Sequence, residues 1–286
     1  MTVWKLLFAA VVTVAGIGLA VSKHSGAPPG AGPVKADGLL PGYLRSSSLP
    51  DGVAMLQGPP STGSVDMKRD EDARAAALKL RGTPRYALAA ADAVRVQKDT
   101  AEAFQCAFGS VISAERTPTL YKLLFRVRFD VRAASYPAKR HFERARPFAA
   151  HKARSCYPPD EKMFREDGSY PSARGAVGWA YAAVLAQLRP ERARQIMERG
   201  AEFGRSRVVC DLEWLSDVEA GRTIATVTLA RLRADPAFNA DMALARKETR
   251  NVSPPVDGTA RCARERAEVA SGEPAHSPVP MTKSSQ

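Results

Sequence analysis

The sequence lacks several features that would assign it to a familiar class of protein. Beyond its N-terminal segment it has no apolar run near the length of about 20 residues that a membrane span needs. It has no alternating strand pattern, no lysine-rich tract, and no CxxC or Cys/His cluster suited to a metal. These absences argue against a multi-span membrane protein, a β-sheet protein and a zinc protein.

The charge of the chain is strongly one-sided. Lys and Arg number 42 against 30 Asp and Glu, which gives a formal net charge of +12. Such an excess suits anionic partners in general, including phosphate esters, nucleic acid and acidic lipid. The basic residues are scattered and are not interleaved with aromatic residues, so nucleic acid is not expected as a partner. Most of the excess is assigned to a solvated, arginine-rich surface.

Residues 1–23 have the character of an export signal or a membrane anchor. Lys5 precedes an apolar run from Leu6 to Ala20, and the small residue Gly18 suits a signal-peptidase site. The run is short for a membrane span, so export is expected and an uncleaved membrane anchor is the alternative. Contact with a membrane is expected only through this segment. The oligomeric state, including a homo-oligomer, is left open.

Four cysteines follow the export signal: Cys106, Cys156, Cys210 and Cys262. An oxidising compartment would pair them in two disulfides. Their spacing alone does not choose among the three pairings that four cysteines allow.

Composition divides the remaining chain into three parts. Residues 24–66 are rich in Gly, Pro and Ser and cannot bury enough apolar surface to fold alone, so a linker or surface wrap is expected. Residues 67–250 carry apolar residues at helical spacing between Gly, Pro and Thr breaks, which predicts one all-α helical-bundle domain. Residues 251–286 are typical of a loose C-terminal extension, which a disulfide at Cys262 could tether.

Helix positions follow from start signals and apolar spacing. Thr117 and Pro118 predict a helix start, because proline at the first helical position gives up no needed hydrogen bond. Further helices are expected at about 138–145, 172–188, 190–207, 213–233 and 236–247.

The first stretch suited to anion binding is KRHFERARP, in which Lys139 precedes Arg146 by seven residues. Seven residues are about two helical turns, so this spacing places both cations on one face of a helix, where they could converge on one anion. An exposed basic helix is the alternative.

Two further stretches carry candidate ligands. In GSYPSARGAVGW, Ser172 and Ala173 stand directly before an apolar helical run, where a serine cap and backbone N–H groups favour a phosphate oxygen. In SRVVCDLEWLSD, Arg207 is followed by Glu213 and, one turn later, by Asp217. Each stretch taken alone could be an ordinary helix cap or a set of surface charges.

In this order the three stretches resemble the signature of the class A bacterial non-specific acid phosphatases, within the type 2 phosphatidic acid phosphatase and vanadium haloperoxidase superfamily. That signature runs K-x6-RP, PSGH and SR-x5-H-x3-D. The sequence matches the first part, has Arg174 for the histidine of the second, and has Glu213 for the histidine of the third. The resemblance extends from about Pro41 to Lys247. It implies an all-α fold, a periplasmic location, and the disulfides Cys156–Cys210 and Cys106–Cys262.

The resemblance also implies a role for each matched position. The phosphate oxygens would be held by Lys139, Arg146, Arg207, the Ser172 hydroxyl and the backbone N–H of Ala173. Glu213 stands where the family has its nucleophilic histidine, which the aspartate at Asp217 orients, and Arg174 stands where the family has its proton-donating histidine. The phosphate-binding groups are therefore kept and both reactive groups are replaced.

The two replacements change the expected chemistry. An arginine keeps its proton at working pH, since its pKa lies above about 12, and makes a poor general acid. A carboxylate at Glu213 carries negative charge toward a negative phosphoryl group. The opposite charges at these two positions predict an Arg174–Glu213 ion pair.

The first hypothesis is an exported acid phosphatase homologue that binds phosphate or a small phosphomonoester, with lost or strongly reduced hydrolysis and with no cofactor or metal. One alternative is an active phosphatase that uses Glu213 as nucleophile or base. Another is a structural or interaction protein with a closed, ion-paired pocket. Rescue by His141 or His151 is not favoured, and His24 and His276 lie in the expected loose ends.

Overall fold

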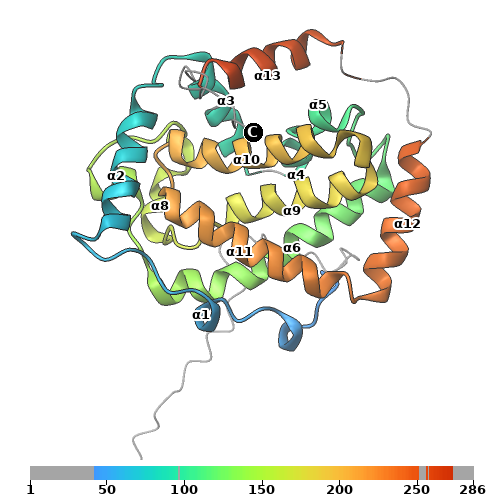
Figure 1. Ribbon diagram of the computed structural model, residues 1–286, viewed down its shortest axis with the longest axis horizontal. Coiled ribbons are helices and arrows are strands. Elements are labelled where there is room, and N and C mark those ends of the chain that lie inside the picture. Colours follow the sequence, from blue (N-terminus) through green and yellow to red (C-terminus); the bar gives the residue numbers. More distant parts are fainter. Residues whose placement is uncertain (1–41, 96, 251–255, 257, 273–286) are drawn as a thin grey trace, which may run out of the picture. The chain divides into compact units, whose positions relative to one another are not determined.

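The computed structural model describes residues 42–272 except 96, 251–255 and 257. The expected signal or anchor at 1–23, together with His24 and His276, lies outside the described residues. Within them, every regular element is a helix and no strand occurs (Figure 1). The all-α prediction is therefore confirmed. None of the described helices is long and apolar enough to cross a membrane.

The helices have the following bounds in chain order. They are η1 (Ser46–Ser48), α1 (Gly52–Met55), α2 (Val65–Leu78), α3 (Pro84–Ala93), α4 (Gln97–Glu102), α5 (Gln105–Phe108), α6 (Pro118–Phe142), α7 (Pro147–Ala150), η2 (Pro158–Asp160), α8 (Glu161–Glu166), α9 (Ala173–Leu188), η3 (Pro190–Arg192), α10 (Ala193–Val209), α11 (Leu215–Leu232), α12 (Pro236–Arg250) and α13 (Ala260–Ala270). The labels η mark short 3₁₀ helices.

Helix α9 runs through the middle of the bundle, packed against α10, α6 and α11 (Figure 1). Most of its side chains are buried, because it is apolar on every face rather than along one stripe. Small residues allow the neighbouring helices to come close. A Cβ atom at Gly178 would lie 2.3 Å from Cδ1 of Phe203 on α10, and one at Gly221 on α11 would lie 2.4 Å from the carbonyl oxygen of Ser172. Close packing thus holds α10 and α11 against α9.

Helix α6 differs from the prediction of a separate helix at about 138–145. It continues through Pro137 and ends where Glu143 adopts the left-handed conformation, with φ of 44°. Proline inside a helix removes one hydrogen bond and crowds the preceding turn. Here the flanking residues Ala134 and Ala138 are fully buried, and we attribute the continuous helix to this packing.

The other expected helices are confirmed as α9, α10, α11 and α12, with small shifts at their ends. The predicted start at Thr117 and Pro118 is also confirmed, since α6 begins at Pro118. The first residues of the range 190–207 form η3 before α10 continues.

The described ends of the chain lie against the bundle. Tyr43 is buried; its backbone N–H donates to Asp130 Oδ2 at 2.8 Å and its hydroxyl donates to Asp241 Oδ2 at 2.8 Å. At the other end, a disulfide joins Cys262 of α13 to Cys106 of α5. The second disulfide is Cys156–Cys210. These are the two pairs that the family resemblance implies.

Candidate active site

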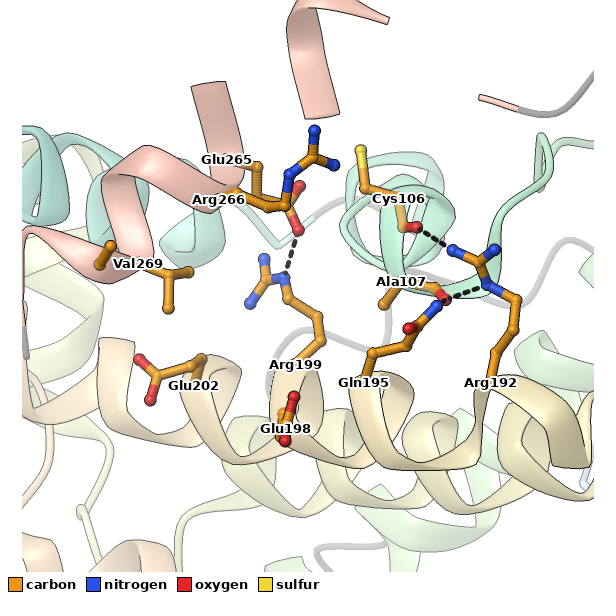
Figure 2. A pocket seen from close by; sticks show the side chains of 11 residues that line it. Cys106, Ala107, Arg192, Gln195, Glu198, Arg199, Glu202, Glu265, Arg266 and Val269 are labelled. Atoms are coloured by element: carbon orange, nitrogen blue, oxygen red, sulfur yellow. Dashed lines mark hydrogen bonds and ion pairs between the residues drawn. The ribbon is translucent and has the colours of Figure 1, made fainter. Parts of the chain in front are cut away.

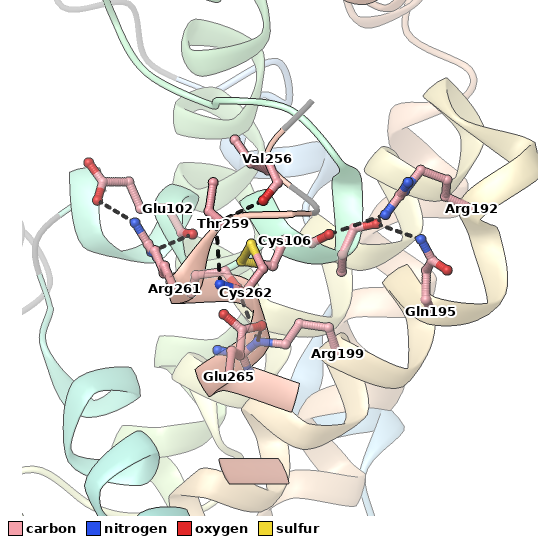
Figure 3. The surroundings of a disulfide bond; sticks show 12 residues. Glu102, Cys106, Arg192, Gln195, Arg199, Val256, Thr259, Arg261, Cys262 and Glu265 are labelled. Carbon is pink, nitrogen blue, oxygen red and sulfur yellow. Dashed lines mark hydrogen bonds and ion pairs between the residues drawn. A yellow bond between two sulfur atoms is a disulfide. The ribbon is translucent and has the colours of Figure 1, made fainter. Parts of the chain in front are cut away.

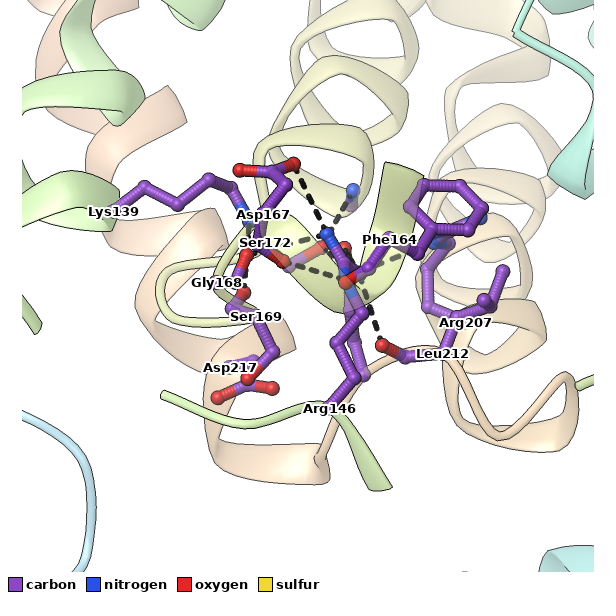
Figure 4. A network of polar contacts seen from close by, with 12 residues as sticks. Lys139, Arg146, Phe164, Asp167, Gly168, Ser169, Ser172, Arg207, Leu212 and Asp217 are labelled. Atoms are coloured by element: carbon purple, nitrogen blue, oxygen red, sulfur yellow. Dashed lines mark hydrogen bonds and ion pairs between the residues drawn. The ribbon is translucent and has the colours of Figure 1, made fainter. Parts of the chain in front are cut away.

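The three motif stretches meet at the N-terminal end of α9 (Figure 4). The Ser172 side-chain oxygen caps this helix by accepting the Gly175 backbone N–H at 2.8 Å. The Ser172 backbone N–H donates to the carbonyl oxygen of Asp217 at 2.8 Å, which ties the cap to α11. Ala173 is buried and is the first residue of α9, where backbone N–H groups have no acceptor within the helix.

Glu213 lies at the centre of this cluster and is 2% exposed. Its carboxylate accepts hydrogen bonds from the Ser172 hydroxyl, from Arg207 Nε at 3.2 Å and from Arg146 Nη1 at 3.3 Å. Burial opposes the charge of Glu213, but Arg207 and Arg146 outweigh it, and the pKa falls to about 2. The carboxylate is therefore ionised, and it is bound by three of the groups that the resemblance implies for phosphate.

Lys139 and Arg146 both hold the loop between α8 and α9 (Figure 4). Lys139 Nζ donates to the carbonyl oxygens of Gly168 and, at 3.2 Å, Ser169. Arg146 Nη2 donates to the same Gly168 oxygen at 3.2 Å and pairs with Asp167 at 3.2 Å. Burial, reinforced by the charge of Arg146, lowers the pKa of Lys139 to about 8.

The predicted common helix face of Lys139 and Arg146 is wrong, although the two side chains do converge. Arg146 lies beyond the end of α6, directly before α7. The left-handed residue Glu143 ends α6 and turns the chain, so the seven-residue spacing does not span two turns of one helix.

Arg207 carries a donor that makes no hydrogen bond within the described residues. Its Nη1 is buried and unpaired, while its Nε donates to Glu213. An unpaired buried N–H group costs free energy, because it has lost its water without gaining an acceptor.

Asp217 makes no hydrogen bond with Glu213 among the described contacts. Its Oδ2 accepts the Trp214 backbone N–H at 2.7 Å, and its Oδ1 accepts Arg144 Nη1 at 2.6 Å. Burial raises the pKa of Asp217 to about 6, although Arg144 opposes the rise. Arg144 also pairs with the buried Asp70 at 2.7 Å. Asp217 thus belongs to an ion network around Arg144.

Sequence reasoning missed this role of Arg144 and Asp70. Arg144 lies within the KRHFERARP stretch, so its position was visible, but nothing local pairs it with a carboxylate 74 residues earlier. Only the fold brings α2 next to this stretch.

Arg174 does not form the predicted ion pair with Glu213. Its Nη2 donates to the carbonyl oxygen of Asp92 at 3.1 Å and to that of Val94, at the end of α3. Its guanidinium carbon lies 5.2 Å from the ring centroid of Phe203. The prediction was wrong because it paired only the two replaced residues, whereas two other cations already hold the Glu213 carboxylate.

The two described histidines lie outside the cluster. His151 Nε2 is 3.0 Å from Glu71 Oε1 at the surface, and the His141 ring packs edge-on against Phe142. Among the described residues, no group of three or more His, Cys, Asp or Glu side chains could hold a metal ion.

Comparison with known proteins agrees with the motif resemblance. Residues 122–239 match the family model described as the PAP2 superfamily, which defines the class. The chain is 36% identical over 238 residues to the non-specific acid phosphatase of Providencia stuartii, an alignment covering 83% of this chain and 95% of that protein. It is 38% identical over 194 residues to the non-specific acid phosphatase of Salmonella typhi, covering 68% and 78% of the two chains.

A further relative is the acid phosphatase of Zymomonas mobilis, 35% identical over 198 residues, which cover 69% of this chain and 75% of that protein. The chain therefore belongs to the bacterial non-specific acid phosphatase family within the PAP2 superfamily. The resemblance drawn from the three motif stretches is confirmed.

Proposed function

We propose that this protein is an exported acid phosphatase homologue that keeps the phosphate-binding cations but has lost phosphohistidine turnover. The observation that carries the proposal is the contact set of Glu213, at the nucleophile position that the resemblance implies. The carboxylate is bound by Ser172, Arg146 and Arg207. An ionised carboxylate repels a negative phosphoryl group, and here it also occupies the groups that would orient that phosphoryl group.

The orientation of Arg174, which stands at the family's proton-donor position, supports the same proposal. Arg174 donates to the carbonyl oxygens of Asp92 and Val94, away from Glu213. Burial, reinforced by the nearby charge of Arg207, lowers the pKa of Arg174 to about 9. The guanidinium keeps its proton at neutral pH, but its hydrogen bonds to backbone carbonyl oxygens direct it away from a leaving alcohol bound at Glu213.

Phosphate binding in this proposal is a competition with Glu213. A phosphate or small phosphomonoester needs Arg146, Arg207 and Ser172, so it must displace the carboxylate before it can enter. The cations Lys139, Arg146 and Arg207 outnumber the carboxylates Glu213 and Asp167 that contact them, which leaves a local positive excess that favours an anion. We therefore expect weak binding without turnover.

Two features support export to the periplasm as part of the proposal. Residues 1–23 have a basic residue followed by an apolar run and small residues. The disulfides Cys106–Cys262 and Cys156–Cys210 suit an oxidising compartment.

Calorimetry with inorganic phosphate, combined with a chromogenic phosphomonoester assay, tests the proposal. The wild-type protein should bind phosphate weakly and should hydrolyse the phosphomonoester no faster than the uncatalysed reaction. Glu213→Gln removes the competing charge and keeps the shape, so it should bind phosphate at least about tenfold more tightly while remaining inactive. Adding Lys139→Ala should reverse that gain.

The alternatives predict other results in the same experiments. An enzyme that uses Glu213 as nucleophile would turn over substrate, lose activity in Glu213→Gln, and form a phosphoenzyme sensitive to hydroxylamine. If the pocket is purely structural, neither the wild-type protein nor Glu213→Gln should bind phosphate. Turnover that depends on Glu213 would overturn the proposal.

A further inference from the structure

Helix α13 is attached to the bundle by one disulfide, by an ion pair with α10 and by contacts with α3. Of its 11 residues, only Cys262 is buried, and Cys262 is bonded to Cys106 of α5 (Figure 3). A helix of this length is marginal in water without tertiary contacts. Its docking therefore depends on the few contacts that hold it.

Two cavities that are open to solvent border α13, so part of its inner face contacts water rather than the bundle. One, of about 710 Å³, lies between α13, α10 and α5 (Figure 2), and the other, of about 530 Å³, lies between α13 and α3. Arg199 and Glu265 line both cavities. Side chains that border such an open cavity contact water on that side, so these faces of α13 add little packing against the bundle.

Glu265 forms the ion pair that crosses from α13 to α10 between these cavities. Its Oε1 lies 3.1 Å from Arg199 Nε (Figure 2). Arg199 is buried and also binds both carboxylate oxygens of Asp92, at 2.6 Å and 3.1 Å. Although burial opposes the charge of Arg199, Asp92 and Glu265 together raise its pKa above the ordinary arginine value. Arg199 thus links α13 to the end of α3.

Asp92 continues this line of contacts to Arg174. Its carboxylate is bound by Arg199 and by the Ser206 hydroxyl, the latter at 2.7 Å. Its carbonyl oxygen accepts a hydrogen bond from Arg174, and so does the carbonyl oxygen of Val94. At the end of α3, Arg199 and Ser206 therefore hold the Asp92 carboxylate, while the backbone carbonyls there hold Arg174.

We propose that α13 is a strap that keeps Arg174 turned away from Glu213, with the Cys106–Cys262 disulfide as its fastening. Glu265 fixes Arg199, Arg199 fixes Asp92, and the end of α3 fixes Arg174. A dithiol reductant converts the disulfide to two thiols and is itself oxidised to a disulfide. Release of α13 then removes Glu265 from Arg199 and loosens the end of α3, so that Arg174 can turn toward the carboxylate of Glu213.

Hydrogen–deuterium exchange of the full-length, oxidised protein tests the strap. Glu265→Gln keeps the disulfide but removes the charge that binds Arg199, and it should speed amide exchange at residues 92–95 at least tenfold. The double substitution Cys106→Ala with Cys262→Ala should do the same and should also speed exchange throughout α13. The matched control is Glu268→Gln on the same helix, where Glu268 has no ion pair or side-chain hydrogen bond among the described residues.

The orientation of Arg174 gives a second readout that simple loosening of α13 would not move. The side-chain Nε–H resonance of Arg174, assigned by its loss in Arg174→Lys, should shift in Glu265→Gln and stay unchanged in Glu268→Gln. If α13 exchanges faster while residues 92–95 and the Arg174 resonance remain as in the wild type, the strap is not coupled to Arg174 and the proposal is overturned. Neither readout depends on phosphate binding, so a failure here is distinct from a failure of the proposed function.

Discussion

Two clusters of charge in the described part of the chain, one at the end of α9 and one beside α13, differ in their balance of sign. The α9 cluster has the cations Lys139, Arg146 and Arg207 around the carboxylate of Glu213. The α13 cluster has Arg85 and Arg199 among Asp92, Glu202 and Glu265. Cations remain in excess in the first cluster when Asp167, the partner of Arg146, is counted. In the second cluster, the exposed Arg205 also pairs with Glu202, so cations and carboxylates are equal in number.

The difference in charge agrees with the function proposed for the α9 cluster. In the α9 cluster the surplus cations complete their hydrogen bonds on loop carbonyls such as that of Gly168. Within the described residues each cluster has one buried, unpaired nitrogen, Nη1 of Arg207 in the first and Nε of Arg85 in the second, so unpaired donors do not distinguish the two. An excess of cations suits a site that accepts an outside anion, with Glu213 in the anion's place. In the α13 cluster both arginines bind carboxylates of the chain itself, which suits a structural connection.

The largest expected effect comes from placing histidine at both positions where the family resemblance implies a reactive histidine. Arg174→His with Glu213→His should raise kcat/KM for a chromogenic phosphomonoester by at least about 10³, since losing such groups costs hydrolases on the order of 10⁴ to 10⁶ in rate. Glu213→His alone lacks the proton donor and should gain less. If the double variant binds phosphate but gains no activity, the site has lost more than its two reactive groups.

The next largest effect is expected from removing the central cation of the α13 cluster. Arg199→Gln leaves the buried Asp92 and the partly buried Glu265 without their shared cation, which should cost about 3–5 kcal/mol in the free energy of unfolding, measured by urea denaturation. The control is Arg205→Gln on the same helix, because Arg205 is 52% exposed and its pair with Glu202 should contribute less than about 1 kcal/mol. Equal losses in the two variants would contradict a structural role for Arg199.

The pH dependence of the free energy of unfolding tests whether Glu213 is ionised in the α9 cluster. The folded-state pKa of Glu213 is about 2, below the ordinary value of about 4.3 in an unfolded chain. Ionised Glu213 therefore stabilises the fold above about pH 4, and this contribution, on the order of 3 kcal/mol, is lost as the pH falls through about 2. Between pH 4 and 2, the wild-type free energy of unfolding should fall more steeply than that of Glu213→Gln. Parallel curves would show that Glu213 is not held as an ion.

The smallest effect concerns the cap that joins the α9 cluster to its helix. Ser172→Ala removes the acceptor of the Gly175 N–H and a donor to Glu213, so it should cost about 1–2 kcal/mol in thermal or urea unfolding. Ser64→Ala removes the comparable cap of α2, which accepts the Met67 N–H at 3.0 Å. It should cost less, because that cap binds no buried charge. A cost of Ser172→Ala no larger than that of Ser64→Ala would mean that the contact with Glu213 adds nothing.

The residues of the α9 cluster could be predicted from the sequence, but their partners could not. Motif spacing identified Lys139, Arg146, Arg207 and Ser172, and the structure brings them to one end of α9. The ion pair of Glu213 was assigned to the wrong arginine, because the direction of Arg174 depends on the end of α3, some 80 residues earlier in the chain. Arg144 and Asp70 were missed for the same reason, since their contact joins α2 to a distant loop.

The sequence by itself determined the helical class, the family and the four residues Lys139, Arg146, Ser172 and Arg207 that gather at the end of α9, because apolar spacing, caps and motif order are local properties of a chain. Only the tertiary structure decided which charges meet. Electrostatic attraction depends on the separation of the groups in space, and the fold brings Arg146 and Arg207 to Glu213 while it holds Arg174 at the end of α3.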